Sequence, residues 1–289
     1  MRIARISTRA FILLLLVSNA GAQTDSPDWQ KYTVKNEQFS VALPSQPAVE
    51  YRRRVGDSHA ERREITLSSF VDGVVYIVHV LENLSPRQSF DSFINDRTRF
   101  GHRLNRKTES KLTLDGVTGK TFSFSSIDGA VQFFSKGDRL YQFAAYGAPQ
   151  DDARVTRFFS SLSLVNNKDA VKLPDEAPSR PLTADTISSA APEQIFTPQE
   201  VDKKFQVIIN PLPEYTEMAR QAKINGTVVL RCTLSSNGQV TTIRVVSGLS
   251  HGLTEMAIAT ARRLKFIPAM KDGKYVSVST QLIYNFELF

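Results

Sequence analysis

The feature that most constrains this fold is a strict alternation of side chains in YVSVSTQLIYNFELF, positions 275–289. Such a period of two predicts a half-buried β-strand about twice the usual length. The sequence holds no later segment to pair with it, so we expect one flank to be available for another polypeptide. The predicted inward face holds Val276, Val278, Thr280, Leu282, Tyr284, Phe286 and Leu288.

The segment before this strand predicts, together with it, a small domain with a three-stranded antiparallel sheet and two helices. LPEYTEMARQAK places Pro213 at a helix start, and GLTEMAIATARRL predicts a second helix. Between them, GTVVLRCTL and QVTTIRVV form a hairpin that turns at Asn237-Gly238. Val240 and Ile243 break the alternation and predict a bulge. The expected inward set of the first hairpin strand is Val228, Leu230, Cys232 and Leu234.

These elements, in this order and spacing, resemble the C-terminal domain of the TonB family. The similar stretches are PEYTEMARQAKINGTVVLRCTL, SSNGQV, RVVSG, ARRLKFIPA, DGK and YNFEL, within residues 212–289. The resemblance implies capture of a short extended peptide, such as a segment of an outer-membrane transporter, by strand addition. The implied peptide-binding residues are Leu212, Pro213, Tyr215, Tyr275, Ser277, Ser279, Gln281, Ile283 and Asn285.

Two features depart from that family. Where the family has Gln-Pro-x-Tyr-Pro, this chain has Leu212-Pro213-Glu214-Tyr215-Thr216. The family's transducers also carry a membrane helix that contacts a motor, whereas this chain begins with a predicted signal peptide and a sheet domain. We therefore expect binding of a peptide or protein without force transmission.

Three occupants of the terminal strand's free flank remain open. An external protein or peptide partner is the first, and self-pairing in a structural homodimer is the second. The third is intramolecular capping by an extra strand, for which FQVII at 205–209 is the candidate.

The sequence of residues 23–165 predicts a separate α+β domain. Apolar strand patterns alternate with Asp-Gly turns, and two helices are expected over residues 89–102 and 151–162. An antiparallel sheet covered by two helices follows. The stretch WQKYTVKNEQFSVALPSQP also resembles, weakly, PsbP-like envelope domains.

Two further segments complete the predicted organisation. Residues 1–22 combine three arginines, a short apolar run and Ala20-Gly21-Ala22, which is typical of a secretory signal peptide. We expect a periplasmic protein, membrane-anchored if this segment is not cleaved. Residues 166–204 contain five prolines among small and acidic residues and predict a flexible, disordered linker to the carboxyl-terminal domain, 205–289.

The sequence argues against an enzyme. GLSHG at 248–252 fits Gly-x-Ser-x-Gly, but no histidine follows His251, as a hydrolase of that class requires. The four histidines and Cys232 have no metal-ligand spacing, so we expect no metal or cofactor. The net charge of +7 includes three arginines of the predicted signal peptide and is weak support for nucleic-acid binding. No small-molecule substrate is evident.

Overall fold

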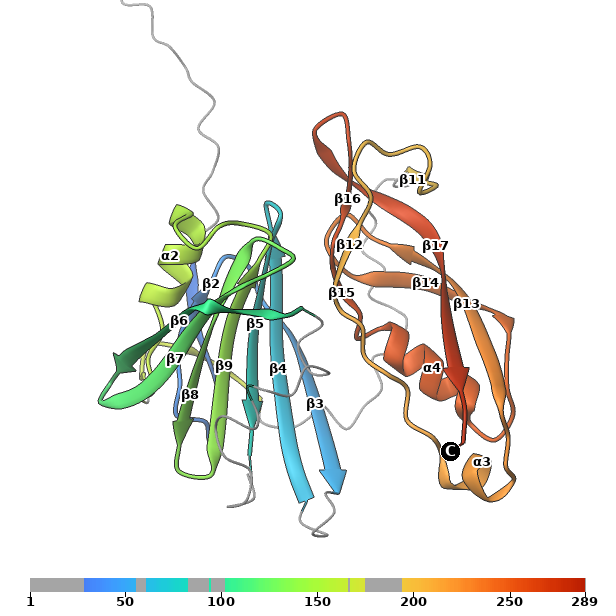
Figure 1. Ribbon diagram of the computed structural model, residues 1–289, viewed down its shortest axis with the longest axis horizontal. Helices are drawn as coiled ribbons and strands as arrows, with labels where there is room; N and C mark the ends of the chain where they lie inside the picture. The colour runs from blue at the N-terminus through green and yellow to red at the C-terminus, as the bar shows by residue number, and fades with distance from the viewer. Residues whose placement is uncertain are drawn as a thin grey trace, which may run out of the picture.

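The computed structural model describes residues 29–55, 61–82, 94, 102–165, 167–174 and 194–288. The described chain folds as two halves that lie side by side (Figure 1). The predicted signal peptide, most of the predicted helix at 89–102 and the middle of the predicted linker lie outside the described residues. Of that helix, the described Ile94 is helical and buried.

The amino-terminal half is built on a seven-stranded antiparallel sheet in the order β3-β4-β5-β9-β8-β7-β6. Asp72-Gly73 and Asp115-Gly116 have positive φ at both positions, as the predicted hairpin turns require. The strands are β3 (Ala48–Val55), β4 (Glu61–Val71), β5 (Val74–Leu81), β6 (Leu104–Leu114), β7 (Val117–Phe124), β8 (Gly129–Lys136) and β9 (Arg139–Tyr146).

One face of this sheet is covered by a three-stranded sheet and a helix. The small sheet has the order β10-β1-β2, and the helix α2 (Ala153–Ser160) buries Val155 and Phe158. The strands are β1 (Gln30–Val34), β2 (Val41–Leu43) and β10 (Val171–Leu173). Because β10 pairs in parallel with β1, the amino-terminal half extends into the segment predicted as a linker.

Asp152 caps helix α2, and its loss should destabilise the protein. Its carboxylate accepts the Arg154 N–H at 2.8 Å and pairs with the Arg154 guanidinium, which lowers the pKa of Asp152 to about 2. Asp152→Ala should lower the free energy of unfolding by about 1 kcal/mol in urea titrations at pH 7. The folded-state pKa lies below the ordinary value, so this contribution should disappear as the pH falls from about 4 to about 2. Asp151→Ala, beside the cap, is the matched control and should be nearly neutral.

The carboxyl-terminal half contains a five-stranded sheet, in which β11-β17-β13-β14 lie in that order and β16 also pairs with β17. The prediction of three antiparallel strands missed β16 and the parallel strand β11. β13 lies between β14 and β17 and is antiparallel to both, so the closing strand is separated from the second hairpin strand by the first. Helices α3 (Glu217–Gln221) and α4 (Leu253–Ala261) pack on one face. The strands are β11 (Ile195–Phe196), β13 (Gly226–Leu234), β14 (Val240–Ser247), β16 (Ala269–Lys271) and β17 (Lys274–Phe286).

The predicted hairpin is confirmed in detail. Val228, Leu230, Cys232 and Leu234 are all buried, and Gly238 has φ +80° in the turn. The pairing of β13 with β14 shifts register where Thr242 adopts φ +48°, next to the predicted bulge. Burial raises the pKa of the Cys232 thiol to about 11, which fits a buried structural residue.

A two-stranded ribbon joins the halves. β12 (Gln206–Ile209) pairs with β15 (Lys265–Ile267), so FQVII does not cap the terminal strand as one alternative proposed. Ile208 of β12 is 1% exposed and belongs to the apolar cluster on the second face of the amino-terminal sheet, with Val75, Ile77 and Tyr146. Ile209 packs against the same cluster, whereas Phe205 and Val207 pack against an apolar cluster of the carboxyl-terminal half.

Polar and aromatic contacts reinforce this junction. The Nε2 atom of His102 lies 3.1 Å from the Val207 carbonyl oxygen, and Lys265 Nζ lies 2.5 Å from a Glu50 carboxylate oxygen. The rings of Phe70 and Tyr275 meet edge to face with centroids 5.4 Å apart. Both halves therefore contribute to one interface.

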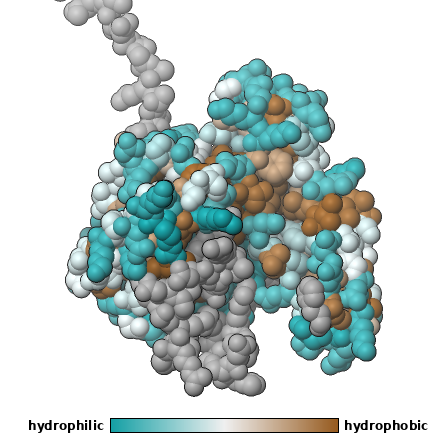
Figure 2. Space-filling view, viewed as in Figure 1, coloured by the Kyte–Doolittle hydropathy of each residue, from teal (hydrophilic) through white to brown (hydrophobic). Residues whose placement is uncertain are grey.

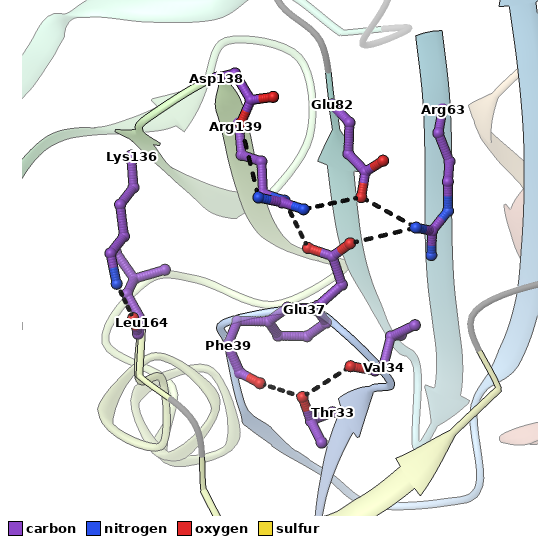
Figure 3. A network of polar contacts seen from close by, with 10 residues as sticks. All are labelled: Thr33, Val34, Glu37, Phe39, Arg63, Glu82, Lys136, Asp138, Arg139 and Leu164. Carbon is purple, nitrogen blue, oxygen red and sulfur yellow. Dashed lines mark hydrogen bonds and ion pairs between the residues drawn. The ribbon is translucent and has the colours of Figure 1, made fainter. Parts of the chain in front are cut away.

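A buried ion network lies at one end of the amino-terminal sheet (Figure 3). The Glu37 side chain is fully buried, with Oε2 3.2 Å from Arg139 Nε and Oε1 3.8 Å from Arg63 Nη1. Glu82 Oε1 lies 3.4 Å from Arg139 Nη2 and 3.2 Å from Arg63 Nη1. Burial raises the pKa of Glu37 to about 8, with a further rise from Glu82, while the two arginines oppose it.

Candidate functional site: the open edge of strand β17

β17 is paired along one flank by β13. Nine consecutive residue pairs, from Gly226 with Phe286 to Leu234 with Val278, show no shift in register. The predicted alternation is present, because Val278, Tyr284 and Phe286 are buried whereas Gln281, Ile283 and Asn285 are exposed. An uninterrupted ladder of this length leaves a backbone without bulges on the opposite flank.

The backbone direction on that opposite flank follows from the β13–β14 hairpin. Ser235 donates its N–H to the Gln239 carbonyl at 2.9 Å, so its backbone groups face β14. N–H directions alternate along a strand, so the even-numbered residues of β13 face β17 and bond its even-numbered residues. The odd-numbered residues of β17 then direct N–H and C=O away from β13; beyond Val278 they are Ser279, Gln281, Ile283 and Asn285.

The start of β17 already has partners within the molecule. β11 runs parallel to it, with Ile195 opposite Ser277 and Phe196 opposite Val278, and β16 pairs with residues 274–276. Ser277 is fully buried, and its hydroxyl oxygen accepts the Ser236 N–H at 2.9 Å. Tyr275 packs against Phe70 of the amino-terminal half. These two predicted peptide-binding residues are therefore occupied, because the chain folds back on this end of the strand.

Residues 279–285 form the open edge, the name used below for this stretch. Among the described residues, no strand pairs with its outer flank beyond the Ser279 N–H, which the parallel pair of Phe196 with Val278 uses. Ile283 is 62% exposed, and hydrophobic side chains gather over the part of this half where β17 lies (Figure 2). Asn285 Oδ1 accepts a hydrogen bond from Thr227 Oγ1 at 3.0 Å on the open face of the sheet. The structure thus brings four of the predicted residues, Ser279, Gln281, Ile283 and Asn285, onto one accessible edge.

The open edge differs from the other long sheet edges because it lacks the bulges and charged residues that prevent pairing with another strand. β14 carries two register shifts and Arg244, and β6 carries a shift between Asn105 and Ser110 in the charged sequence NRKTESK. β3 carries Arg52 and Arg53. Bulges and charges are the usual means of preventing edge pairing. In contrast, no charged residue occurs from Tyr275 to Phe286, and the ladder from 278 to 286 is regular.

The three other predicted residues lie in the turn before helix α3. Tyr215 packs its ring edge to face on Phe286 at 5.4 Å and donates its hydroxyl proton to the Ile224 carbonyl at 2.9 Å. Tyr215 therefore stabilises the carboxyl-terminal end of β17, from the face of the sheet that the helices cover. Leu212 is 78% exposed, and Pro213 is half-buried beside it. Leu212 is thus accessible to a partner, whereas the Tyr215 ring is part of the local packing.

The remaining candidate chemistry is sparse. Ser250 Oγ lies 2.8 Å from Nδ1 of the adjacent His251, and both residues are exposed in the loop before α4. Thr254 Oγ1 binds both the N–H and the carbonyl of Leu249, so this hydroxyl organises the loop. Within the described ranges, no group of three or more His, Cys, Asp or Glu side chains could hold a metal ion. In the same ranges, no helix is both long and apolar enough to cross a membrane.

Comparison with protein families confirms the resemblance of the carboxyl-terminal half. Residues 211–288 match the family model described as Gram-negative bacterial TonB protein C-terminal. The match covers 78 of the 289 residues and includes the open edge and the turn at Leu212. No curated protein matches the chain.

Two solved structures are similar to parts of the chain. The TonB C-terminal domain of Pseudomonas aeruginosa, determined in solution by NMR, has 22% identity and a TM-score of 0.26. The match covers 30% of this chain and 92% of that one. The cyanobacterial PsbP of Synechocystis sp. PCC 6803 has 11% identity and a TM-score of 0.34, with 52% of this chain and 98% of that one covered.

Proposed function

We propose that this protein binds an extended segment of another protein by strand addition to the open edge of β17. The observation that carries the proposal is the contrast between edges. β3, β6 and β14 carry charges or bulges, whereas residues 279–285 are regular, uncharged and, beyond the Ser279 N–H, unpaired among the described residues. In this mode, backbone hydrogen bonds provide affinity, and the alternating side chains provide selectivity.

The side chains along the open edge define the kind of segment it accepts. Gln281 and Asn285 flank the exposed Ile283 on the open face of the sheet. A β-branched or aromatic side chain opposite Ile283 would form a favourable cross-strand pair, worth about 0.2–1 kcal/mol. We therefore expect an uncharged segment with an apolar residue at that position and polar residues two positions away on either side.

The family match supports a cell-envelope role. TonB C-terminal domains interact with outer-membrane proteins, so a segment of an outer-membrane protein is the partner we propose. Export to the periplasm by the predicted signal peptide is part of this proposal. The carboxyl-terminal half acts as the interaction module, and no catalytic step is assigned to it.

A second copy of the chain is the alternative partner. The outward backbone groups of the open edge are symmetric about Leu282, so an antiparallel copy would place Ser279 opposite Asn285 and Gln281 opposite Ile283. A two-fold dimer requires such self-complementarity. The experiment below separates this homodimer from an external partner.

Gln281→Pro should abolish strand addition with little loss of stability. The Gln281 N–H faces away from β13, so proline removes a donor of the open edge without breaking the internal ladder. In the full-length protein, a photo-crosslinking residue in place of Ile283 should capture the partner in cells. Gln281→Pro should lower the crosslinked yield at least tenfold, which corresponds to about 1.4 kcal/mol of binding free energy.

Two controls define the outcome. Gln281→Thr retains the backbone donor and should leave crosslinking unchanged, and a crosslinker in place of Val246, exposed on the bulged β14, should capture little. A product whose mass equals two copies of the chain would identify the homodimer. Equal yields from positions 283 and 246, or no effect of proline, would contradict strand addition.

A further inference from the structure

A strap of chain, residues Ile195–Lys203, encloses the hairpin of β16 and β17. Its first two residues are β11, on the outer flank of β17. Its end pairs with β16, where Met270 donates to the Lys203 carbonyl at 2.9 Å and its own carbonyl accepts the N–H groups of Asp202 and Lys203. The strap therefore contacts both strands of this hairpin.

Side chains fix the strap between these two points. Glu200 Oε2 accepts both the N–H and the hydroxyl of Thr197, at 2.6 and 2.8 Å. Lys271 Nζ donates to the Glu200 carbonyl at 2.8 Å and lies 5.5 Å from the centre of the Phe196 ring. Asp202 Oδ2 accepts the Asp272 N–H at 2.7 Å in the hairpin turn. Displacing the strap would break all of these contacts together.

The position at which the strap leaves β17 marks the end of the open edge. β11 is parallel to β17, so its continuation beyond Phe196 would run along Ser279 and the residues after it. Pro198 has no N–H to donate to a ladder, and the chain turns away at Thr197, where the N–H binds Glu200 instead. Pairing by the strap consequently stops at the Ser279 N–H, the first group of the open edge.

We propose that the strap is a fixed stop that sets the register and maximum length of the bound strand. This inference rests on the strand addition proposed above. A strand added to β17 meets β11 end to end beyond Ser279 and can pair only with residues 279–285. The edge therefore selects an extended segment of about seven residues in one register, and longer segments must leave the sheet beyond Ser279.

A strand fused to the full-length chain tests the stop without a natural partner. The probe is an alternating Thr-Val strand of five, seven, nine or eleven residues with a terminal lysine, attached after Phe289 through a Gly-Ser linker. The linker keeps the probe at high effective concentration beside β17. Amide hydrogen exchange of β17 and the melting temperature report how far the probe pairs.

Exchange at Gln281, Ile283 and Asn285 should slow at least tenfold once the probe has seven residues, and the melting temperature should then stay constant for nine and eleven. Ile195→Pro with Phe196→Pro removes the donors of β11, so the melting temperature should continue to rise up to eleven residues. Ile195→Val with Phe196→Tyr keeps the strap and should behave as wild type.

Two results would overturn the stop. One is a continuing rise in the wild-type melting temperature beyond seven residues, with rapid exchange at Ile195 and Phe196 showing that the probe displaced β11. The other is an identical length dependence in the double-proline variant. If no probe length protects Gln281 or Ile283, strand addition itself fails, and the stop fails with it.

Discussion

Arg139→Met should lower the free energy of unfolding by about 3 kcal/mol at pH 9, measured by urea titration. The substitution removes the closest cation to the fully buried Glu37 carboxylate and also a partner of Glu82. An ionised Glu37 carboxylate would then lack water and would keep only the more distant Arg63, at 3.8 Å, as a counter-ion. Removing one member of a buried ion cluster is therefore more costly than removing an exposed charge.

The size of this loss should depend on pH. The pKa of Glu37 is raised above its ordinary value, to about 8, so the folded protein holds this proton over a pH range in which the unfolded chain has released it. Stability should consequently decrease as the pH rises from about 5 to about 8. At pH 5 Glu37 is protonated and needs no cation, so Arg139→Met should cost clearly less than at pH 9.

Two variants serve as controls for this network. Lys111→Met replaces an exposed cation of the same sheet and should change stability by less than about 0.5 kcal/mol. Glu37→Gln removes the titrating group and should flatten the decrease in stability between pH 5 and 8. Equal losses for Arg139→Met at pH 5 and pH 9 would show that the Glu37 charge is not the cause.

Gly73→Ala should weaken the junction between the halves and destabilise the protein by about 2–5 kcal/mol. Gly73 has φ +82°, where a Cβ costs about 1–2 kcal/mol. A Cβ at this position would also lie 2.0 Å from Tyr275 Oη, so the tyrosine must move away from Phe70. Overpacking of this kind costs a further 1–3 kcal/mol or so.

Gly116 provides a matched control for the backbone term. It occupies the same place in an Asp-Gly turn, with φ +78°, but a Cβ there would meet no atom within 4 Å. Gly116→Ala should therefore show the conformational cost alone, and the difference between the two variants in urea titrations isolates the contact with Tyr275. Adding Tyr275→Phe to Gly73→Ala should recover part of the difference. Equal losses of stability for Gly73→Ala and Gly116→Ala would show that the contact with Tyr275 makes no contribution to stability.

Much of the carboxyl-terminal half could be predicted because its signals are local. Asn237-Gly238 specifies a tight turn, the inward set from Val228 to Leu234 follows a period of two, and the irregular spacing of Val240 and Ile243 marks a bulge. The alternation in β17 also predicted that Ser279, Gln281, Ile283 and Asn285 share one side of the strand. In each case the information lies within a few residues of the feature it specifies.

Features that depend on distant partners were missed. β11 has two residues in a proline-containing segment, and it forms because the flank of Ser277 and Val278 accepts it. β10 has three residues and depends on β1. The occupation of Tyr275 depends on Phe70 and Gly73, about 200 positions earlier in the chain. No local pattern encodes such contacts, so the sequence alone placed Tyr275 and Ser277 among the accessible residues.

Ile208 connects the two halves through one apolar cluster. The second face of the amino-terminal sheet is apolar, with Val75, Ile77 and Phe122 in its cluster, and β12 contributes Ile208 to it. A fragment that ends before β12 would expose the part of this face that Ile208 covers to water and to other apolar surfaces. Partner assays on isolated fragments would then report adhesion of that uncovered face, which is why single substitutions in the intact chain are the sounder test.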